Sequence, residues 1–330
     1  MEAILRMRKR QLLLAGLCSA FLAATPAWPQ QWPTKPIRWI VPYTPGGITD
    51  NVTRYVTQQL SERLGQTIIV ENKPGANSIL AADYVAKSAP DGYVILTVIA
   101  AHAANATLYK GKLNFDPVKS FAPISLAAVA PLMVSVNPSF PAKDMKELIA
   151  YAKANPGKVS FGSSGIGSAT HLTMELLKQT AGIDMVHIPF KGTAPGIAAA
   201  VAGDIQVEGD VPSALMPHVR AGRLRAICVY SKSRVAGAPE VPTIVEAGGP
   251  PIEGSTWVMF LAPAGTPQSI VNRLSEETAR IVNDPAMKKR LEDLGIDPAG
   301  TTPAETAKFL QDEIAKWGKV IEVAGVKPEA

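Results

Sequence analysis

The chain has 330 residues, with 33 basic and 28 acidic side chains and two cysteines. Its formal charge of +5 comes largely from the first 27 residues, without which 29 basic residues face 27 acidic ones. The charge therefore gives no support to a nucleic-acid partner. Only Cys228 remains beyond that segment, which excludes an internal disulfide there, and we expect it to be an inert core thiol.

The N-terminus has the pattern of an export signal. A basic segment, Arg6–Arg10, precedes the apolar run Leu12–Ala24, and Thr25-Pro26-Ala27 supplies small residues for cleavage. The apolar run is shorter than the roughly 20 residues that a membrane-spanning helix needs. We therefore predict a signal peptide over residues 1–27, cleaved near Ala27, and a periplasmic protein.

Short apolar strands then alternate with helices along the chain. We predict strands over residues 37–42, 67–71, 93–99, 159–162, 185–189, 205–208, 225–230 and 255–261. We predict helices over residues 50–65, 78–87, 144–155, 169–181, 195–202, 267–283, 285–294 and 303–324. Asp50 is the expected N-cap of the first helix. This alternation predicts an α/β fold with mostly parallel sheets, whose loops at the carboxyl ends of the strands form a ligand crevice.

The length exceeds one ordinary core and indicates two lobes. An apolar stretch at 125–137 is expected to cross to the second lobe, and the strand at 255–261 to return. Two crossings imply a hinge. We predict these boundaries: lobe 1 over 28–128 and 254–303, lobe 2 over 129–253, and a C-terminal helix within 304–330 packed on the body.

Three times an apolar strand runs into a loop of Gly, Ser, Thr and Pro that opens a helix, at residues 40–50, 159–170 and 186–194. Such a junction directs backbone N–H groups and the positive end of a helix at one point, which favours a bound anion. Lys191 is a candidate cation beside that anion, with a solvated lysine as the alternative. Trp257 is expected either in the core or on the cleft wall.

Other chemistries find little support in the sequence. No P-loop is present, and the glycines at 162–167 lack the spacing of a dinucleotide fingerprint. Ser163, Ser164 and His171 could suggest hydrolysis, but no G-x-S-x-G elbow surrounds them. The histidines are scattered without metal-ligand spacing. We therefore predict no catalytic set, no metal site and no cofactor.

A basic set near the end of the second lobe leaves two interpretations open. It comprises His218, Arg220, Arg223 and Arg225. The set is typical of a solvated helix end, and contact with an anion or a partner is the alternative.

Many segments in order resemble the periplasmic solute receptors of tripartite tricarboxylate transporters. The resemblance covers essentially all of the chain after the signal. It rests on these segments: Trp32–Arg38, Pro45–Asp50, Val70–Ala76, Ala89–Tyr93, Ser163–Gly165, His187–Gly192, Pro212–Ala214 and Leu261–Pro267.

The resemblance implies a two-lobe fold, like a type II periplasmic binding protein, that closes on a small organic acid. It places ligand contacts in the first loop, the 72–78 loop, the 163–171 loop and the region before Pro212. Together with the junctions above, it gives these candidate ligand-binding residues: Tyr43, Pro45, Gly46, Gly47, Ile48, Thr49, Asp50, Asn77, Ser78, His102, Ser163, Ser164, Gly165, Ser168, His171, Lys191, Gly192, Gly209, Asp210 and Trp257.

Two departures from the family pattern are expected to affect the ligand. Ile48 replaces a third glycine and adds an apolar branch beside the anion site. An aromatic-Asp-Asn motif becomes Glu208-Gly209-Asp210, so a carboxylate moves by one residue and an aromatic ring is lost. Two acidic groups here could favour a ligand that carries an amine.

The sequence thus predicts an exported, monomeric, non-enzymatic receptor for a small organic carboxylate. Its expected partners are membrane transporter subunits or the outer domain of a sensor kinase, which the sequence does not distinguish. A periplasmic hydrolase or isomerase using the same cleft is the alternative from another class.

Overall fold

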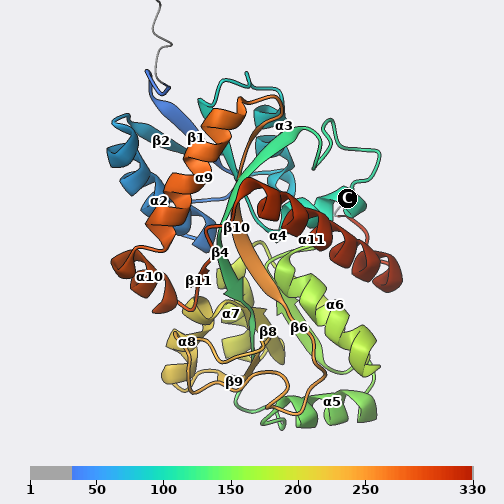
Figure 1. The fold of residues 1–330 in the computed structure, drawn as a ribbon. Helices are drawn as coiled ribbons and strands as arrows, with labels where there is room; N and C mark the ends of the chain where they lie inside the picture. Colours follow the sequence, from blue (N-terminus) through green and yellow to red (C-terminus); the bar gives the residue numbers. More distant parts are fainter. Residues whose placement is uncertain (1–31, 329–330) are drawn as a thin grey trace, which may run out of the picture. The chain divides into compact units, whose positions relative to one another are not determined.

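The computed structural model describes residues 32–328, and Lys35–Ala330 form one compact unit (Figure 1). The predicted signal peptide lies outside the described residues. One of two sheets, here sheet A, has the strand order β11-β4-β10-β3-β1-β2. Its strands are β1 (Ile37–Val41), β2 (Ile68–Asn72), β3 (Val94–Val98), β4 (Phe121–Pro131), β10 (Ser255–Pro263) and β11 (Asp297–Pro298).

The second sheet, sheet B, is built from the middle of the chain, in the order β7-β6-β8-β5-β9. Its strands are β5 (Met133–Val136), β6 (Ser160–Ser163), β7 (Val186–Pro189), β8 (Val207–Asp210) and β9 (Arg225–Val229). The predicted α/β arrangement with two sheets is confirmed. The sheets are mixed rather than mostly parallel, because β4, β10 and β5 run antiparallel to their neighbours as the chain crosses between sheets.

Helices pack around both sheets (Figure 1). They are α2 (Ile48–Leu64), the 3₁₀ turn η1 (Ala76–Ser78), α3 (Ile79–Ala86), α4 (Ala100–Leu108), α5 (Met145–Ala154), α6 (Ala169–Ala181), α7 (Thr193–Ala202), α8 (Pro212–Arg220), α9 (Gln268–Val282), α10 (Pro285–Glu292) and α11 (Pro303–Ala324). Sequence reasoning missed α4, most of α8 and the short β11. No helix within residues 32–328 is long and apolar enough to cross a membrane.

Each sheet has its own apolar core. In sheet A the fully buried Trp39 meets Phe260 edge to face, with ring centroids 4.8 Å apart. The core of sheet B includes Met133 of β5, Ile197 of α7 and Leu215 of α8. The two cores are separate, and the space between the sheets is crossed by the segments that join them.

Backbone hydrogen bonds tie the crossing segments together. Leu132 lies between β4 and β5, and its N–H donates to the carbonyl of Gly254 just before β10, over 2.9 Å. The N–H of Gly254 donates to Tyr230, and the N–H of Tyr230 donates back to Leu132. The two crossings predicted from sequence therefore lie side by side between the sheets.

Helix α11 packs on sheet A through a buried carboxylate. Oε2 of Glu313 accepts from the indole N–H of Trp257 on β10 over 2.8 Å and of Trp317 on α11 over 2.7 Å. Both rings are fully buried. The helix also contacts α4, β4 and α6, so it touches helices that belong to both sheets.

Glu313→Ala is predicted to lower the free energy of unfolding by about 3 kcal/mol, because it leaves two buried indole N–H groups without an acceptor. Glu313→Gln keeps a carbonyl oxygen at the site and should cost less than half as much. Asp312→Ala, which removes only an exposed ion pair with Lys308, is the control, with an expected change within about 0.5 kcal/mol. Urea denaturation measures all three variants. Equal losses for Ala and Gln at position 313 would contradict the assigned role.

Candidate functional site

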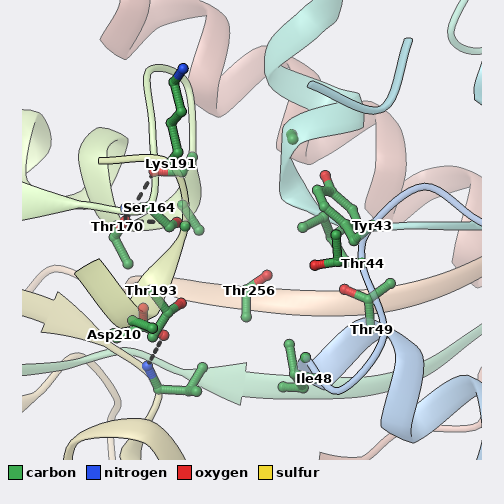
Figure 2. A pocket seen from close by; sticks show the side chains of 18 of the residues that line it. Tyr43, Thr44, Ile48, Thr49, Ser164, Thr170, Lys191, Thr193, Asp210 and Thr256 are labelled. Atoms are coloured by element: carbon green, nitrogen blue, oxygen red, sulfur yellow. Dashed lines mark hydrogen bonds between the residues drawn. The ribbon is translucent and has the colours of Figure 1, made fainter. Parts of the chain in front are cut away.

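A cavity of about 420 Å³ lies between the two sheets (Figure 2). Loops and helix starts next to sheet A supply one wall, formed by Tyr43, Thr44, Gly47, Ile48, Thr49, Asn77, Ile99 and Ala101. The facing wall consists of Ser164, Ser168, Ala169, Thr170, Lys191, Gly192, Thr193, Ala194, Pro195, Asp210 and Val211. Leu132 and Thr256, on the crossing segments, complete the lining between the walls.

Helix α2 opens onto this cavity without a side-chain cap. Its N-cap residue, Gly47, has an extended backbone and supplies no side chain to the first-turn N–H groups. The prediction that Asp50 is the N-cap was wrong, since Asp50 lies inside the first turn. The N–H groups of the first turn have no acceptor within the helix and are therefore available to an anion.

Asp50 instead holds the loop before α2. Its Oδ2 accepts from the N–H of Gly46 over 3.0 Å, and its carboxylate takes hydrogen bonds from Arg54 and Asn72. Burial raises the pKa of Asp50, but the hydrogen bonds from Arg54, Asn72 and Gly46 outweigh this effect and hold it below its usual value. Asn72 also donates to the carbonyl of Tyr43. Asp50 therefore positions the loop and does not line the cavity.

The turn at 76–78 is strained, and it carries Asn77 to the cavity wall. Ala76, Asn77 and Ser78 all have positive φ, at 46°, 48° and 74°. Such residues cost on the order of 1–2 kcal/mol each relative to right-handed backbone. Reciprocal hydrogen bonds with Asn105 of α4 hold the turn, since Asn77 Nδ2 donates to Asn105 Oδ1 and Asn105 Nδ2 donates to the Asn77 carbonyl.

Helix α7 is the second uncapped helix at the cavity. Its N-cap is Gly192, with φ at 104° and no side-chain cap, and its first residues Thr193 and Ala194 line the space. In contrast, α6 is capped, because Oγ of Ser168 accepts from the N–H of His171. The N-cap residues of α4 and α8, Ile99 and Val211, also line the cavity without a side-chain cap. Of these four helix starts, α2 and α7 are the two that follow a glycine.

Hydroxyl groups supply further donors. Figure 2 shows Thr44 and Thr49 on one wall, Ser164, Thr170 and Thr193 on the other, and Thr256 between them. Lys191 is the only lysine or arginine lining this cavity, and its exposed side chain extends away from Asp210 in Figure 2. A few hydrogen bonds to a charged group, each worth roughly 1.5–3 kcal/mol, suffice to hold an anion without arginine.

Strand alternation decides which residues of β8 and β10 face the cavity. On β8, Glu208 and Asp210 share one side, whereas Gly209 points to the other. On β10, Thr256 faces the cavity, whereas Trp257 points to the opposite side and bonds Glu313. Gly209 and Trp257, which were predicted to contact the ligand, therefore do not face the cavity. Their neighbours Asp210 and Thr256 face it instead.

Burial changes the acidity of the β8 carboxyls. Desolvation, with a contribution from Asp210, raises the pKa of Glu208 to about 9. Desolvation also raises the pKa of Asp210, while hydrogen bonds from Thr193 and the N–H of Val211 oppose that effect. Glu208 therefore keeps its proton at neutral pH, and Asp210 is a weaker acid than an exposed aspartate.

His102, a predicted contact, is a core residue on α4. It is 1% exposed, its Nε2 hydrogen-bonds the carbonyl of Pro117 over 2.9 Å, and its ring packs against Phe115 and Phe121. Desolvation lowers its pKa to about 4. The ring is thus neutral and points away from the cavity wall.

The buried Ser163 and His171 and the half-buried His187 form a cluster behind the cavity. Ser163 Oγ lies 2.7 Å from His187 Nε2, and the rings of His187 and His171 stack at 3.7 Å between centroids. Desolvation lowers their pKa values, to about 3 for His171 and about 4 for His187. Ser163 is fully buried and absent from the cavity lining, so this serine–histidine pair does not reach a ligand held there.

The remaining predicted residues divide between the cavity and the neighbouring loops. Those that line it are Tyr43, Gly47, Ile48, Thr49, Asn77, Ser164, Ser168, Lys191, Gly192 and Asp210. Pro45, Gly165 and the buried Ser78 lie on the same loops but not on the wall. Burial raises the pKa of Tyr43, whose hydroxyl lies beside Ser78.

A second cavity, of about 830 Å³, adjoins the first and shares its wall at Ile48, Ala194 and Asp210. Gly46, His218 and Arg223 also line it. Arg225, in contrast, donates to three backbone carbonyls, of Pro138, Phe140 and Ala142. The predicted basic set therefore separates. Arg225 is structural, the exposed Arg220 pairs with Glu240, and Arg223 and His218 lie beside the second cavity. Burial and the neighbouring Arg223 lower the pKa of His218.

Sequence reasoning missed several lining residues. They are Thr44, Ile99, Ala101, Leu132, Ala169, Thr170, Thr193, Ala194, Pro195, Val211 and Thr256. A signal existed for Thr193, which lies within the third glycine-rich junction, and for Thr256, which follows from the strand period once Trp257 is assigned to the core. No local pattern indicates Leu132.

Residues 52–326 match the family described as "Tripartite tricarboxylate transporter family receptor". A UPF0065 protein of Bordetella pertussis is 35% identical over 315 residues, which is 93% of this chain and 95% of that protein. BugT of the same organism is 32% identical over 305 residues, 92% of this chain and 94% of BugT. The chain therefore belongs to the tripartite tricarboxylate transporter receptor family.

Two solved structures from Rhodopseudomonas palustris are similar throughout. One, solved with adipate, is 34% identical, with a TM-score of 0.82, over 90% of this chain and 100% of that one. MatC, with bound malate, is 32% identical, with a TM-score of 0.77, over 88% of this chain and 100% of MatC. These likenesses confirm the predicted family and the two-lobe periplasmic binding protein fold, and the family is one of periplasmic receptors.

The buried Glu208 makes a prediction for stability. Because the folded state keeps this proton up to about pH 9 and the unfolded state releases it near 4.5, the folded state binds more protons between those values, and stability falls as pH rises. Between pH 7 and 9 the loss approaches about 1.4 kcal/mol per pH unit.

Glu208→Gln is predicted to flatten that slope, as measured by urea denaturation at several pH values. Asp204→Asn, an exposed carboxylate just before β8, is the control and should keep the wild-type slope. The same slope in wild type and Glu208→Gln would show that Glu208 is ionised in the folded protein.

Proposed function

We propose that this chain is a periplasmic receptor that binds a small organic carboxylate in the cavity between its two sheets. The observation that carries the proposal is the convergence of two uncapped helix N-termini, those of α2 and α7, on one cavity. Unfilled N–H groups with the positive ends of two helices attract an anion, and the surrounding hydroxyls add neutral donors.

The relatives support the chemical class. Members of the family have been solved with adipate and with malate, both small dicarboxylates. The first cavity continues into the second, so its size does not exclude a diacid of that length. The scarcity of cations on the wall favours recognition by hydrogen bonds over ion pairing.

We further propose that the ligand leaves the protein chemically unchanged. Ser163 and His187 are the serine–histidine pair that could support hydrolysis, but Ser163 is fully buried and neither residue lines the cavity. Recovery of an acid of altered mass after incubation with the protein would contradict this proposal.

The proposed lobes follow the sheets. Lobe 1, over 28–128 and 254–303, contains sheet A except for the end of β4, residues 129–131. Lobe 2, over 129–253, contains that end of β4 and all five strands of sheet B. We propose that the lobes close about the crossing segments at Leu132 and Gly254. Membrane transporter subunits or a sensor kinase would then bind the closed form. Co-purification with one of these partners would distinguish uptake from sensing.

A thermal-shift screen of protein purified from the periplasm and freed of ligand tests the proposal. At one hundred times Kd, a ligand stabilises the fold by about 2.7 kcal/mol. We expect adipate, malate or another small carboxylate to raise Tm by several degrees. No shift with any carboxylate, from protein shown to be folded, would contradict the proposed function.

Thr49→Val tests the geometry, because it removes a cavity hydroxyl at almost unchanged side-chain size. It should weaken binding of the best acid roughly tenfold or more, as expected for a lost hydrogen bond to a charged group. Thr180→Val, on the exposed side of α6, removes a hydroxyl far from the lining and should leave Kd unchanged. Equal Kd values for both variants would place the carboxylate elsewhere.

A further inference from the structure

Strand β8 presents two buried carboxyl groups side by side. Glu208 and Asp210 are two residues apart, so their side chains leave the strand on the same face. Glu208 is 0% exposed and Asp210 is 6% exposed. Neither carboxyl forms an ion pair within the described part of the chain. Two acids without a cation are unusual in a site that takes an anion, and they call for a physical explanation.

Glu208 fills a slot that two glycines leave open. A Cβ atom built on Gly162 of β6 would lie 2.0 Å from Glu208 Oε2, and one on Gly196 of α7 would lie 3.0 Å from each carboxylate oxygen. Neither oxygen of Glu208 has a hydrogen-bond partner within the described residues. A charge in such a place is strongly disfavoured, so Glu208 is held as the neutral acid.

One carboxyl oxygen of Asp210 bonds the backbone, since its Oδ1 accepts from the N–H of Val211 over 2.7 Å. The Thr193 hydroxyl also hydrogen-bonds this carboxyl group. The buried Oδ2 has no hydrogen-bond partner among the described residues. Figure 2 shows Asp210 beside Thr193 on the cavity wall, close to the start of α7. Asp210 therefore belongs to the lining, and Glu208 lies behind it.

Neighbouring elements supply little compensating charge. Strands β5, β6 and β10, helix α7 and the loop at 164–168 carry no titratable side chain. On the other elements around the two cavities, the titratable groups are Tyr43, Lys191, His171, His187, His218, Arg223 and Asp50, which pairs with Arg54. Helix α6 also carries Glu175 and Lys178, which pair with each other. None of them forms an ion pair with Asp210, and a carboxylate ligand placed beside an ionised Asp210 would be repelled.

We propose that Asp210 binds the ligand as a neutral carboxylic acid that donates its proton to a carboxylate oxygen of the ligand. The inference rests on the proposed carboxylate-binding function. No bond to carbon forms or breaks; a proton is taken from solvent whenever Asp210 is ionised in the free protein.

Proton-linked capture has a measurable consequence. Above the pKa of Asp210 in the free protein, each binding event takes up a proton, so affinity falls by up to about tenfold per pH unit. Above pH 6.5 a carboxylic acid ligand of ordinary pKa is already fully ionised. A pH dependence of the affinity in that range therefore comes from a group on the protein. The histidines behind the wall are neutral throughout that range.

Isothermal titration calorimetry with adipate and with malate, from pH 6.5 to 9 and in two buffers of different ionisation enthalpy, tests the proposal. Wild type should bind more weakly as pH rises and take up as much as one proton. Asp210→Asn should bind more weakly than wild type at pH 6.5, with affinity independent of pH, because an amide donates at every pH. Asp204→Asn is the control and should keep the wild-type profile.

Glu208→Gln is a second control. Because Glu208 is already the neutral acid over most of this range, the change removes no charge, and affinity should decline with pH as it does in wild type. The wild-type measurement itself requires no variant to fold.

Three results would count against the account, and each is distinguishable. Wild-type affinity that is constant from pH 6.5 to 9, with no proton uptake, overturns the inference while leaving the carboxylate receptor intact. Preference for aspartate over succinate, lost in Asp210→Asn, overturns it in favour of an ionised Asp210 that binds an ammonium group. Failure of every acid to bind at any pH contradicts the proposed function itself.

Discussion

The unfilled N-termini of α2 and α7 are the constraint on which the site depends. Both helices begin after a glycine, so no side chain occupies the first-turn N–H groups. Those groups need an acceptor, and the cavity offers only water or a ligand. The surrounding structure follows from this requirement: Asp50 fixes the loop before α2, and Asn105 holds the strained turn that brings Asn77 to the wall.

The buried acids of β8 complement that arrangement. A cavity rich in N–H and hydroxyl groups attracts an anion, and an ionised carboxylate on its wall would oppose this. The position of Glu208 between Gly162 and Gly196, away from any partner, favours its neutral state. Selectivity can then depend on the proton that Asp210 donates, which makes the site's chemistry different from one that relies on arginine.

Much of the fold could be predicted from the sequence because the signals were local. The last helix was predicted over 303–324 and lies there, since Thr302 and Glu305 form a capping box ahead of Pro303. Helix α4 was missed because its alanine-rich sequence directly follows a strand without a turn signal. The first helix began earlier than predicted because a glycine cap leaves no polar signature.

The site was predictable as a set of loops and less so as individual side chains. The glycine-rich junctions lie on loops that line the cavity. The choice between Thr256 and Trp257, or between Gly209 and Asp210, depends on which face of a strand is turned to the other sheet, and that is a tertiary property. Glu313 accepts hydrogen bonds from Trp257, 56 residues earlier in the chain, and from Trp317, one helix turn later. No pattern in the sequence around Glu313 predicts this role.

The most direct test of the central claim is a crystal structure of the periplasmically purified protein with the acid that stabilises it most. The account predicts a ligand carboxylate within about 2.7–3.2 Å of first-turn N–H groups of both α2 and α7. A carboxylate paired with Lys191 or Arg223, and out of reach of both helix N-termini, would contradict it.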